Sequence, residues 1–284
     1  MKIYPISVTK KVNATSFRGA KFTADVPYKK QLQRGLKDFY GITCKLSDLD
    51  SIVGPNELKY IINNLKPKFY EIGENFRAQF HLHTKDSDGS LTLKDYLEQC
   101  VDWANHIFKN PKHRDNLPPF SASITDHDSA ENVKRAVAEI SQNPERYKNF
   151  KFVTGCEFMF DGYKKPFTAF EAVGLGFNPF DEDIQPLIAG QRIAHNKVSD
   201  IAKVKNAGGV LSLAHPLVTP HRLDDDFFSF LKENGVEGVE GNYQYIHWDT
   251  EYVETIKPIV EKFIKKYGLF STGGTDTHRA NIFK

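Results

Sequence analysis

From about Phe76 onward, short runs of apolar and β-branched residues alternate with longer amphipathic stretches. The short runs predict seven strands, at Ala78–Thr84, Phe120–Thr125, Phe152–Phe158, Thr168–Phe177, Gly209–Ala214, Val236–Tyr243 and Leu269–Thr275. The longer stretches predict five helices, at Thr92–Phe108, Ala130–Ser141, Ile184–Asn206, Asp224–Glu233 and Glu251–Tyr267. Strands that alternate with helices are typical of βα units in a parallel sheet, so we predict an α/β fold.

The first 74 residues follow a different pattern. They predict one helix near Lys29–Asp38 and another near Glu57–Leu65. Residues 1–40 hold nine Lys and Arg against two Asp, although the whole chain has a net charge of only +2. We interpret this arm as a solvated tail, with attraction of a polyanion as the alternative. The predicted organisation is an extension of unknown role over residues 1–74 and an α/β domain over 75–284.

Cysteine usage and hydropathy predict the compartment of the protein and its relation to membranes. The three cysteines are widely spaced and include no CxxC pair, which argues against a disulfide framework and fits a reducing compartment. No apolar run approaches the roughly 18 residues of a membrane span. We therefore expect a cytoplasmic protein with no membrane partner, and the sequence does not indicate its oligomeric state.

Residues that bind metals stand at the ends of nearly all the predicted strands. In strand order they are His81 and His83, Asp126 to Asp128 with His127 between them, Glu157, Glu171, His215, and finally Asp276 and His278. The sixth strand ends at Asn242 and Tyr243, without a histidine or carboxylate. In a barrel of parallel strands these ends form one face, where reactive groups gather.

The chemistry of this set favours a transition-metal site. Alternate residues of a strand point to the same side, so His81 and His83 can aim at one point. Imidazole with carboxylate suits Zn, Mn or Fe better than Mg or Ca. Each motif alone has an ordinary structural explanation, such as a helix cap at Asp126 or a core histidine at His215. Together they predict a shared site, which His221 would also line if it faces the same pocket.

Five motifs, in this order, resemble those of the PHP (polymerase and histidinol phosphatase) family. They are HLHTKDSDG at 81–89, ITDHD at 124–128, GCEF at 155–158, LAHP at 213–216 and GGTDTH at 273–278. The resemblance covers residues 76–284. The family's fold is a distorted seven-stranded (β/α)7 barrel of TIM-like form, which agrees with the seven strands predicted above.

The resemblance implies a trinuclear site of two to three divalent metal ions. One metal would take His81, His83, Glu157 and Asp276. A second would share Glu157 and take His215, with Glu171 standing where many members have a histidine. A third would take Asp88, His127 and His278. A further departure is Gln79, which stands where many members have an aspartate.

The first motif looks most like the small stand-alone members, which act on nucleotides or short oligonucleotides. The implied function is a phosphoesterase that hydrolyses a phosphate monoester of a nucleotide or small phosphorylated metabolite through a metal-bridging hydroxide. His127, His278 and Asp276 would take part in catalysis. Arg192 and Arg222 would grip the phosphate, with Lys197 as a weaker candidate, and Tyr243 would stack on the substrate or pack within the fold.

Three alternatives remain open on the sequence. The same site could serve a 5′-3′ exonuclease on short RNA or DNA, with the basic arm attracting nucleic acid. An amidohydrolase-type metal hydrolase also begins with HxH, but it usually has a bridging lysine where this chain has Glu171. A degenerate barrel that binds metal without turnover is the third.

Overall fold

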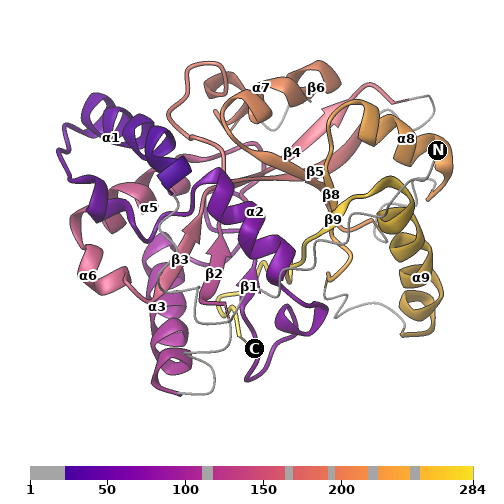
Figure 1. The fold of residues 1–284 in the computed structure, drawn as a ribbon, viewed down its shortest axis with the longest axis horizontal. Helices are drawn as coiled ribbons and strands as arrows, with labels where there is room; N and C mark the ends of the chain where they lie inside the picture. Colours follow the sequence, from indigo (N-terminus) through magenta and orange to yellow (C-terminus); the bar gives the residue numbers. More distant parts are fainter. Residues whose placement is uncertain are drawn as a thin grey trace, which may run out of the picture.

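The computed structural model describes residues 23–110, 118–163, 169–190, 196–216, 223–243 and 250–283. Its strands form two sheets, flanked by helices (Figure 1). The smaller sheet is parallel, in the order β1 (Ala78–Gln79), β2 (Phe120–Ser123) and β3 (Phe150–Val153). Helix α3 (Leu93–Lys109) leads from β1 to β2, and helices α5 (Glu131–Gln142) and α6 (Pro144–Tyr147) lead from β2 to β3.

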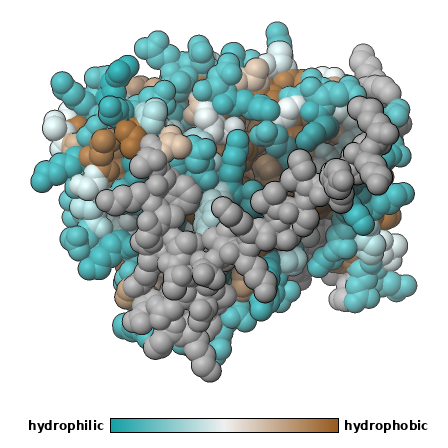
Figure 2. All heavy atoms as spheres, viewed as in Figure 1, coloured by the Kyte–Doolittle hydropathy of each residue, from teal (hydrophilic) through white to brown (hydrophobic). Residues whose placement is uncertain are grey.

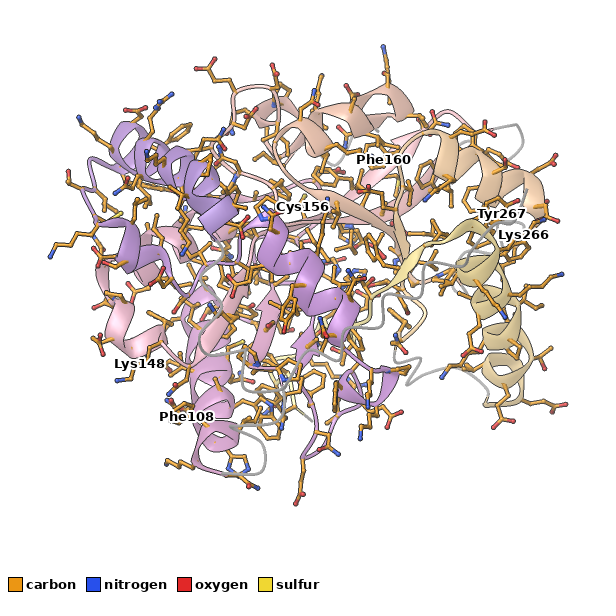
Figure 3. The ribbon with its side chains drawn as sticks, viewed as in Figure 1. Phe108, Lys148, Cys156, Phe160, Lys266 and Tyr267 are labelled. Atoms are coloured by element: carbon orange, nitrogen blue, oxygen red, sulfur yellow. The ribbon has the colours of Figure 1, made fainter. Side chains whose placement is uncertain are left out.

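The larger sheet is mixed. Its order is β6 (Asn196–Lys197), β4 (Gly155–Asp161), β5 (Ala169–Leu175), β7 (Val210–Leu213), β8 (Gly238–Val239) and β9 (Phe270–Ser271). Strand β5 runs antiparallel to both β4 and β7, whereas the other pairs are parallel. Helices α7 (Ile201–Asn206), α8 (Asp225–Glu233) and α9 (Thr250–Tyr267) accompany this sheet. At the end of α9, the Tyr267 hydroxyl donates to Asp225 Oδ1 at 3.0 Å, which joins α9 to α8 (Figure 3).

The prediction of a seven-stranded (β/α)7 barrel is wrong, because the described strands form two sheets that do not close into a barrel. The predicted strand Phe152–Phe158 divides at Thr154, so that β3 pairs with β2 and β4 pairs with β5. The other edge of β3 is taken by the N-terminal region, where Ile52 pairs with Phe152. Among the described residues, isolated bridges connect the regions of the two sheets, from His127 to Glu157 and from Leu82 to Thr277.

The direction of β5 has a simple cause. Parallel neighbours need a crossover of about a dozen residues or more, whereas antiparallel neighbours can follow a short connection. Only seven residues separate Asp161 from Ala169, so β5 must turn back along β4. The sequence indicated a hairpin or loop at this point, and that local prediction agrees with the pairing.

Four of the five predicted helices are confirmed, as α3, α5, α8 and α9. The Thr92 hydroxyl caps α3 by accepting from the backbone N–H of Asp95, and Asp224 caps α8 by accepting from that of Phe227. The predicted helix Ile184–Asn206 is wrong as a single element. Its described residues form the 3₁₀ turn η5 (Gln185–Leu187), strand β6, the turn η6 (Val198–Asp200) and the short helix α7.

The described part of the N-terminal extension contributes to the core. It contains helix α1 (Val26–Tyr40), helix α2 (Pro55–Asn64) and the turns η2 (Thr23–Asp25), η3 (Leu46–Leu49) and η4 (Pro67–Phe69). Leu32 and Leu36 of α1 are fully buried in a cluster with residues of α3, α5 and β2. Val53 and Leu58 lie in a second cluster with residues of β5 and β7. Residues 23–74 therefore pack as part of the same interior as the sheets.

Hydrophilic side chains cover much of the face in Figure 2, with a brown area over α1. Three large apolar side chains of α1 are exposed, namely Val26, Phe39 and Tyr40. Within the described ranges, none of the helices has both the length and the apolar character needed to cross a bilayer.

Candidate metal centre

Four ligand-type side chains meet where the two sheets are bridged. His81 and His83 follow β1, Glu157 lies within β4, and Asp276 follows β9. Glu157 Oε2 lies 3.1 Å from His81 Nε2 and 3.2 Å from His83 Nε2. Asp276 Oδ1 lies 3.3 Å and 3.0 Å from the same two nitrogens. The four side chains could hold a metal ion, since their ligand atoms all lie within 4.8 Å of one another.

The orphaned atoms of this group fit a metal ion. Within the described part of the chain, Glu157 Oε2, Asp276 Oδ1 and His83 Nδ1 are buried without a hydrogen-bond partner. A buried polar atom without a partner costs free energy, so such atoms are rare unless something else satisfies them. Both orphaned oxygens face the two Nε2 atoms. A divalent cation among them would satisfy these oxygens and offset their charge.

A second group lies at the exposed edge of the first and shares His83 with it. It consists of His83, Asp88, His127 and His278. The His83 ring stacks between those of His127 and His278, with ring centroids 4.5 Å away on each side. Asp88 Oδ1 lies 3.2 Å from His278 Nε2. The side chains of Asp88 and His278 are 38% and 41% exposed, so this edge is open to solvent.

A third group shares Glu157 with the first and has a larger proportion of carboxylates. It consists of His127, Glu157 and Glu171. His215 also reaches it, with Nε2 2.9 Å from Glu157 Oε1 and 3.4 Å from Glu171 Oε2. Glu171 therefore lies beside the other ligand-type residues even though β5 runs opposite to the predicted direction.

The close packing of these groups shifts their pKa values in the metal-free chain. Burial alone would lower the pKa of His81, but Glu157, Glu240 and Asp276 raise it well above its usual value. Burial likewise opposes the charge on His83, yet Asp276 and Glu157 raise its pKa to about 9. For Glu157, burial would raise the pKa, but the charge of His81 and the hydrogen bond with His215 hold it well below the usual range. These shifts favour imidazolium at His81 and His83 beside the carboxylate of Glu157.

The pKa values at the borders of the cluster move in the opposite directions. Burial raises the pKa of Glu171, and the nearby charge of Glu157 raises it further. Burial lowers the pKa of His127. Both shifts favour the neutral side chain. Glu171 therefore holds a proton more tightly than Glu157 does, and a metal at the third group would compete with that proton.

The backbone is strained at the cluster. Asp128, His215 and Asp276 are the non-glycine residues with positive φ in the described part of the chain, at 46°, 21° and 45°. Such conformations cost of order 1–3 kcal/mol each and cluster at functional sites. His215 and Asp276 supply ligand-type atoms, and Asp128 directly follows His127. The turns that carry these side chains are thus held in place by the surrounding structure.

Glu240 belongs to the cluster but is absent from the residues predicted from the sequence. It directly follows β8, is 1% exposed, and its Oε1 lies 3.0 Å from His81 Nδ1. Its Oε2 accepts a hydrogen bond of 2.7 Å from the backbone N–H of His215. The prediction considered the end of the sixth strand, at Asn242 and Tyr243, whereas Glu240 lies inside that predicted strand. A glutamate inside an apolar strand run was the signal that could have found Glu240.

Three other polar residues support the motifs. Tyr243 donates from its hydroxyl to Asp276 Oδ2 at 2.8 Å. Gln79 accepts through Oε1 from the backbone N–H groups of His81 and Thr275. Asp126 accepts from both the backbone N–H and the hydroxyl of Thr84, at 2.6 Å each, so it orders the loop after His83. Cys156, which precedes Glu157, lies near the middle of the molecule (Figure 3).

Most of the residues predicted to contact phosphate are not described by the structure. Arg192 and Arg222 lie outside the described residues, as does His221. Lys197 is described and lies exposed at the edge strand β6. Among the predicted site residues, the structure therefore brings together the nine ligand candidates and Tyr243.

No protein-family model matches the chain, and no curated protein matches it either.

Proposed function

We propose that this protein is a metal-dependent phosphoesterase of the PHP type, acting on the phosphate monoester of a nucleotide or small phosphorylated metabolite. The observation that carries the proposal is the overlap of three ligand groups around Glu157 and the histidines of the first motif. Overlapping groups favour several metals close together, which is the usual arrangement for cleaving phosphate esters.

The proposed metals are Zn, Mn or Fe, because the ligand set mixes imidazole with carboxylate. When bound, such metals lower the pKa of water toward neutrality and offset the negative charge of a phosphoryl group. His81, His83, Glu157 and Asp276 would hold the buried metal. Glu157 would connect it to His215 and Glu171, whereas Asp88, His127 and His278 would hold the outer one.

The open edge of the cluster suggests how the chain would treat a substrate. Asp88 and His278 are the exposed members, so the phosphoryl group would arrive on their side. His278 Nε2 lies on that side, 3.2 Å from Asp88 Oδ1, and is the atom that would bind the outer metal. His278 Nδ1 lies 3.0 Å from the carbonyl oxygen of Asp276 and would donate to it, which orients the ring. Arg192 and Arg222 remain the proposed phosphate contacts.

The decisive experiment combines metal analysis with turnover. The protein would be purified without chelator, its metals counted, and phosphate release measured from nucleoside monophosphates, 3′,5′-bisphosphates and a 5′-phosphorylated oligonucleotide. His83→Ala and Asp276→Ala should abolish release, whereas His106→Ala should not, because His106 is an exposed histidine of α3 outside the cluster.

The substrate profile separates the proposal from its alternatives. Preference for the oligonucleotide, with successive release of mononucleotides, would identify the 5′-3′ exonuclease. Metal binding with no release from any phosphate ester would exclude the phosphoesterase and lead to tests of amide substrates. A chain that binds no metal would contradict the whole proposal.

A further inference from the structure

Glu240 is a buried carboxylate that contacts two ligand-type histidines from different strands. Its Oε1 and Oε2 lie 3.0 Å and 3.1 Å from Nδ1 of His81. Its Oε2 also accepts from the backbone N–H of His215 at 2.7 Å. In the described part of the chain, no lysine or arginine forms an ion pair with it, so its charge is compensated within the cluster.

We propose that Glu240 is a positioning residue that fixes the donor atom of His81 and the backbone of His215. This inference rests on the metal-binding part of the proposed function and is independent of the substrate. The ligand group faces Nε2 of His81. Glu240 contacts Nδ1, on the opposite side of the ring, and so acts on the ligand group through His81.

The contact with His81 determines which ring nitrogen is free. A carboxylate beside Nδ1 favours a proton on that nitrogen, which leaves the lone pair on Nε2. Nε2 is the atom that faces the group, 3.1 Å from Glu157 Oε2 and 3.3 Å from Asp276 Oδ1. Glu240 therefore favours the tautomer of His81 that can bind a metal there.

The contact with His215 acts on the backbone. His215 has a φ of 21°, which is unfavourable for a residue with a side chain. A charged acceptor on its N–H stabilises this conformation, since hydrogen bonds to ionised groups are stronger than neutral ones. The same turn directs Nε2 of His215 to Glu157, at 2.9 Å. One carboxylate thus positions ligand-type histidines that follow β1 and β7.

The first test measures zinc affinity by competition with a chelator, without substrate. Glu240→Gln keeps an oxygen acceptor but removes the charge, and Glu240→Ala removes both. We expect Glu240→Ala to bind zinc about 10 to 100-fold more weakly and Glu240→Gln to fall between it and the wild type. The matched control is Glu237→Gln, because Glu237 belongs to the same segment but pairs at the surface with Lys205. Unchanged affinity in both Glu240 variants would overturn the proposal.

The second test is made on wild-type protein, so its result does not depend on whether a Glu240 variant folds. In wild-type protein labelled with ¹⁵N-histidine and loaded with zinc, His81 should show a protonated Nδ1 and a slowly exchanging, downfield proton. His81→Gln assigns that signal by its loss. An Nε2-protonated His81, or a wild type that binds no zinc, would contradict the inference. Failure of phosphate release with zinc affinity still dependent on Glu240 would reject the phosphoesterase and leave this inference standing.

Discussion

The hydroxyl of Tyr243 donates a hydrogen bond of 2.8 Å to Oδ2 of Asp276, and the other oxygen of that carboxylate faces His81 and His83. One oxygen is thus held by a neutral donor, while Oδ1 is directed to the ligand group. The Tyr243 ring also lies edge-on to the rings of His81 and His215, with centroids 6.3 Å and 5.9 Å away. Tyr243 therefore packs against the cluster and orients one of its carboxylates.

Tyr243→Phe should weaken metal binding with little loss of fold stability. The ring keeps its packing, but Asp276 loses the donor that fixes its orientation. We expect about a three- to tenfold lower zinc affinity, at the weak end of the effects of residues that support metal ligands. Chelator competition and thermal unfolding would measure both quantities, with Tyr267→Phe at the distant α8–α9 contact as the control. An affinity equal to that of the wild type would show that the hydrogen bond has no role in metal binding.

Metal binding should release protons and become tighter as the pH rises toward 9. The pKa of His83 lies near 9 and that of His81 lies well above its usual value, so both rings are expected to be protonated at pH 7. The pKa of His215 is shifted in the same direction. A metal must displace those protons. Titration calorimetry in buffers of different ionisation enthalpy would count them. No proton release at pH 7 would contradict the raised pKa values.

The stability of the metal-free protein should fall as the pH rises from about 6.5 to 9. A histidine whose folded pKa exceeds its unfolded value stabilises the fold below the unfolded pKa, and this contribution disappears as the pH passes the folded pKa. The pKa of His83, about 9, sets the upper end of the pH range over which stability falls. Urea unfolding of chelator-treated protein at several pH values would test this. Metal-loaded protein should show a weaker decline and, at a metal concentration 100 times Kd, about 2.7 kcal/mol of added stability.

Glu171→Gln should remove one metal and leave the buried one. Glu171 belongs to the third ligand group and is absent from the first. Its loss leaves fewer carboxylate oxygens at the third group. Glu171→His should retain the metal count but shift its preference from Mn toward Zn, because imidazole suits zinc better than it suits manganese. Metal analysis after growth with each metal would measure this, with the exposed Glu182→Gln as the control.

Leu32→Ala should destabilise the whole protein even though Leu32 lies in the N-terminal extension. Its side chain is fully buried against residues of the α/β region. Truncating a buried leucine costs about 2–5 kcal/mol. We expect a single unfolding transition at lower urea concentration, while Lys30→Ala on the exposed face of α1 should be near neutral. A protein truncated to residues 75–284 that still unfolded cooperatively would show that the extension is a separate unit.

The sequence by itself determined the residue types of the site and most of the helices. Amphipathic periodicity is local, so α3, α5, α8 and α9 could be read from it within one or two residues. The ligand-type residues could be found in the same way, because each follows or lies in a recognisable strand. Their order along the chain was enough to predict a shared site.

Only the tertiary structure decided how the strands pair and which polar residues support the ligands. The division at Thr154 and the pairing of Ile52 with Phe152 depend on contacts between distant segments, which strand periodicity does not encode. The same limit explains Glu240. The role of Glu240 depends on the residues that it contacts. These residues, His81 and His215, lie 159 and 25 residues away along the chain, so the sequence near Glu240 does not reveal them.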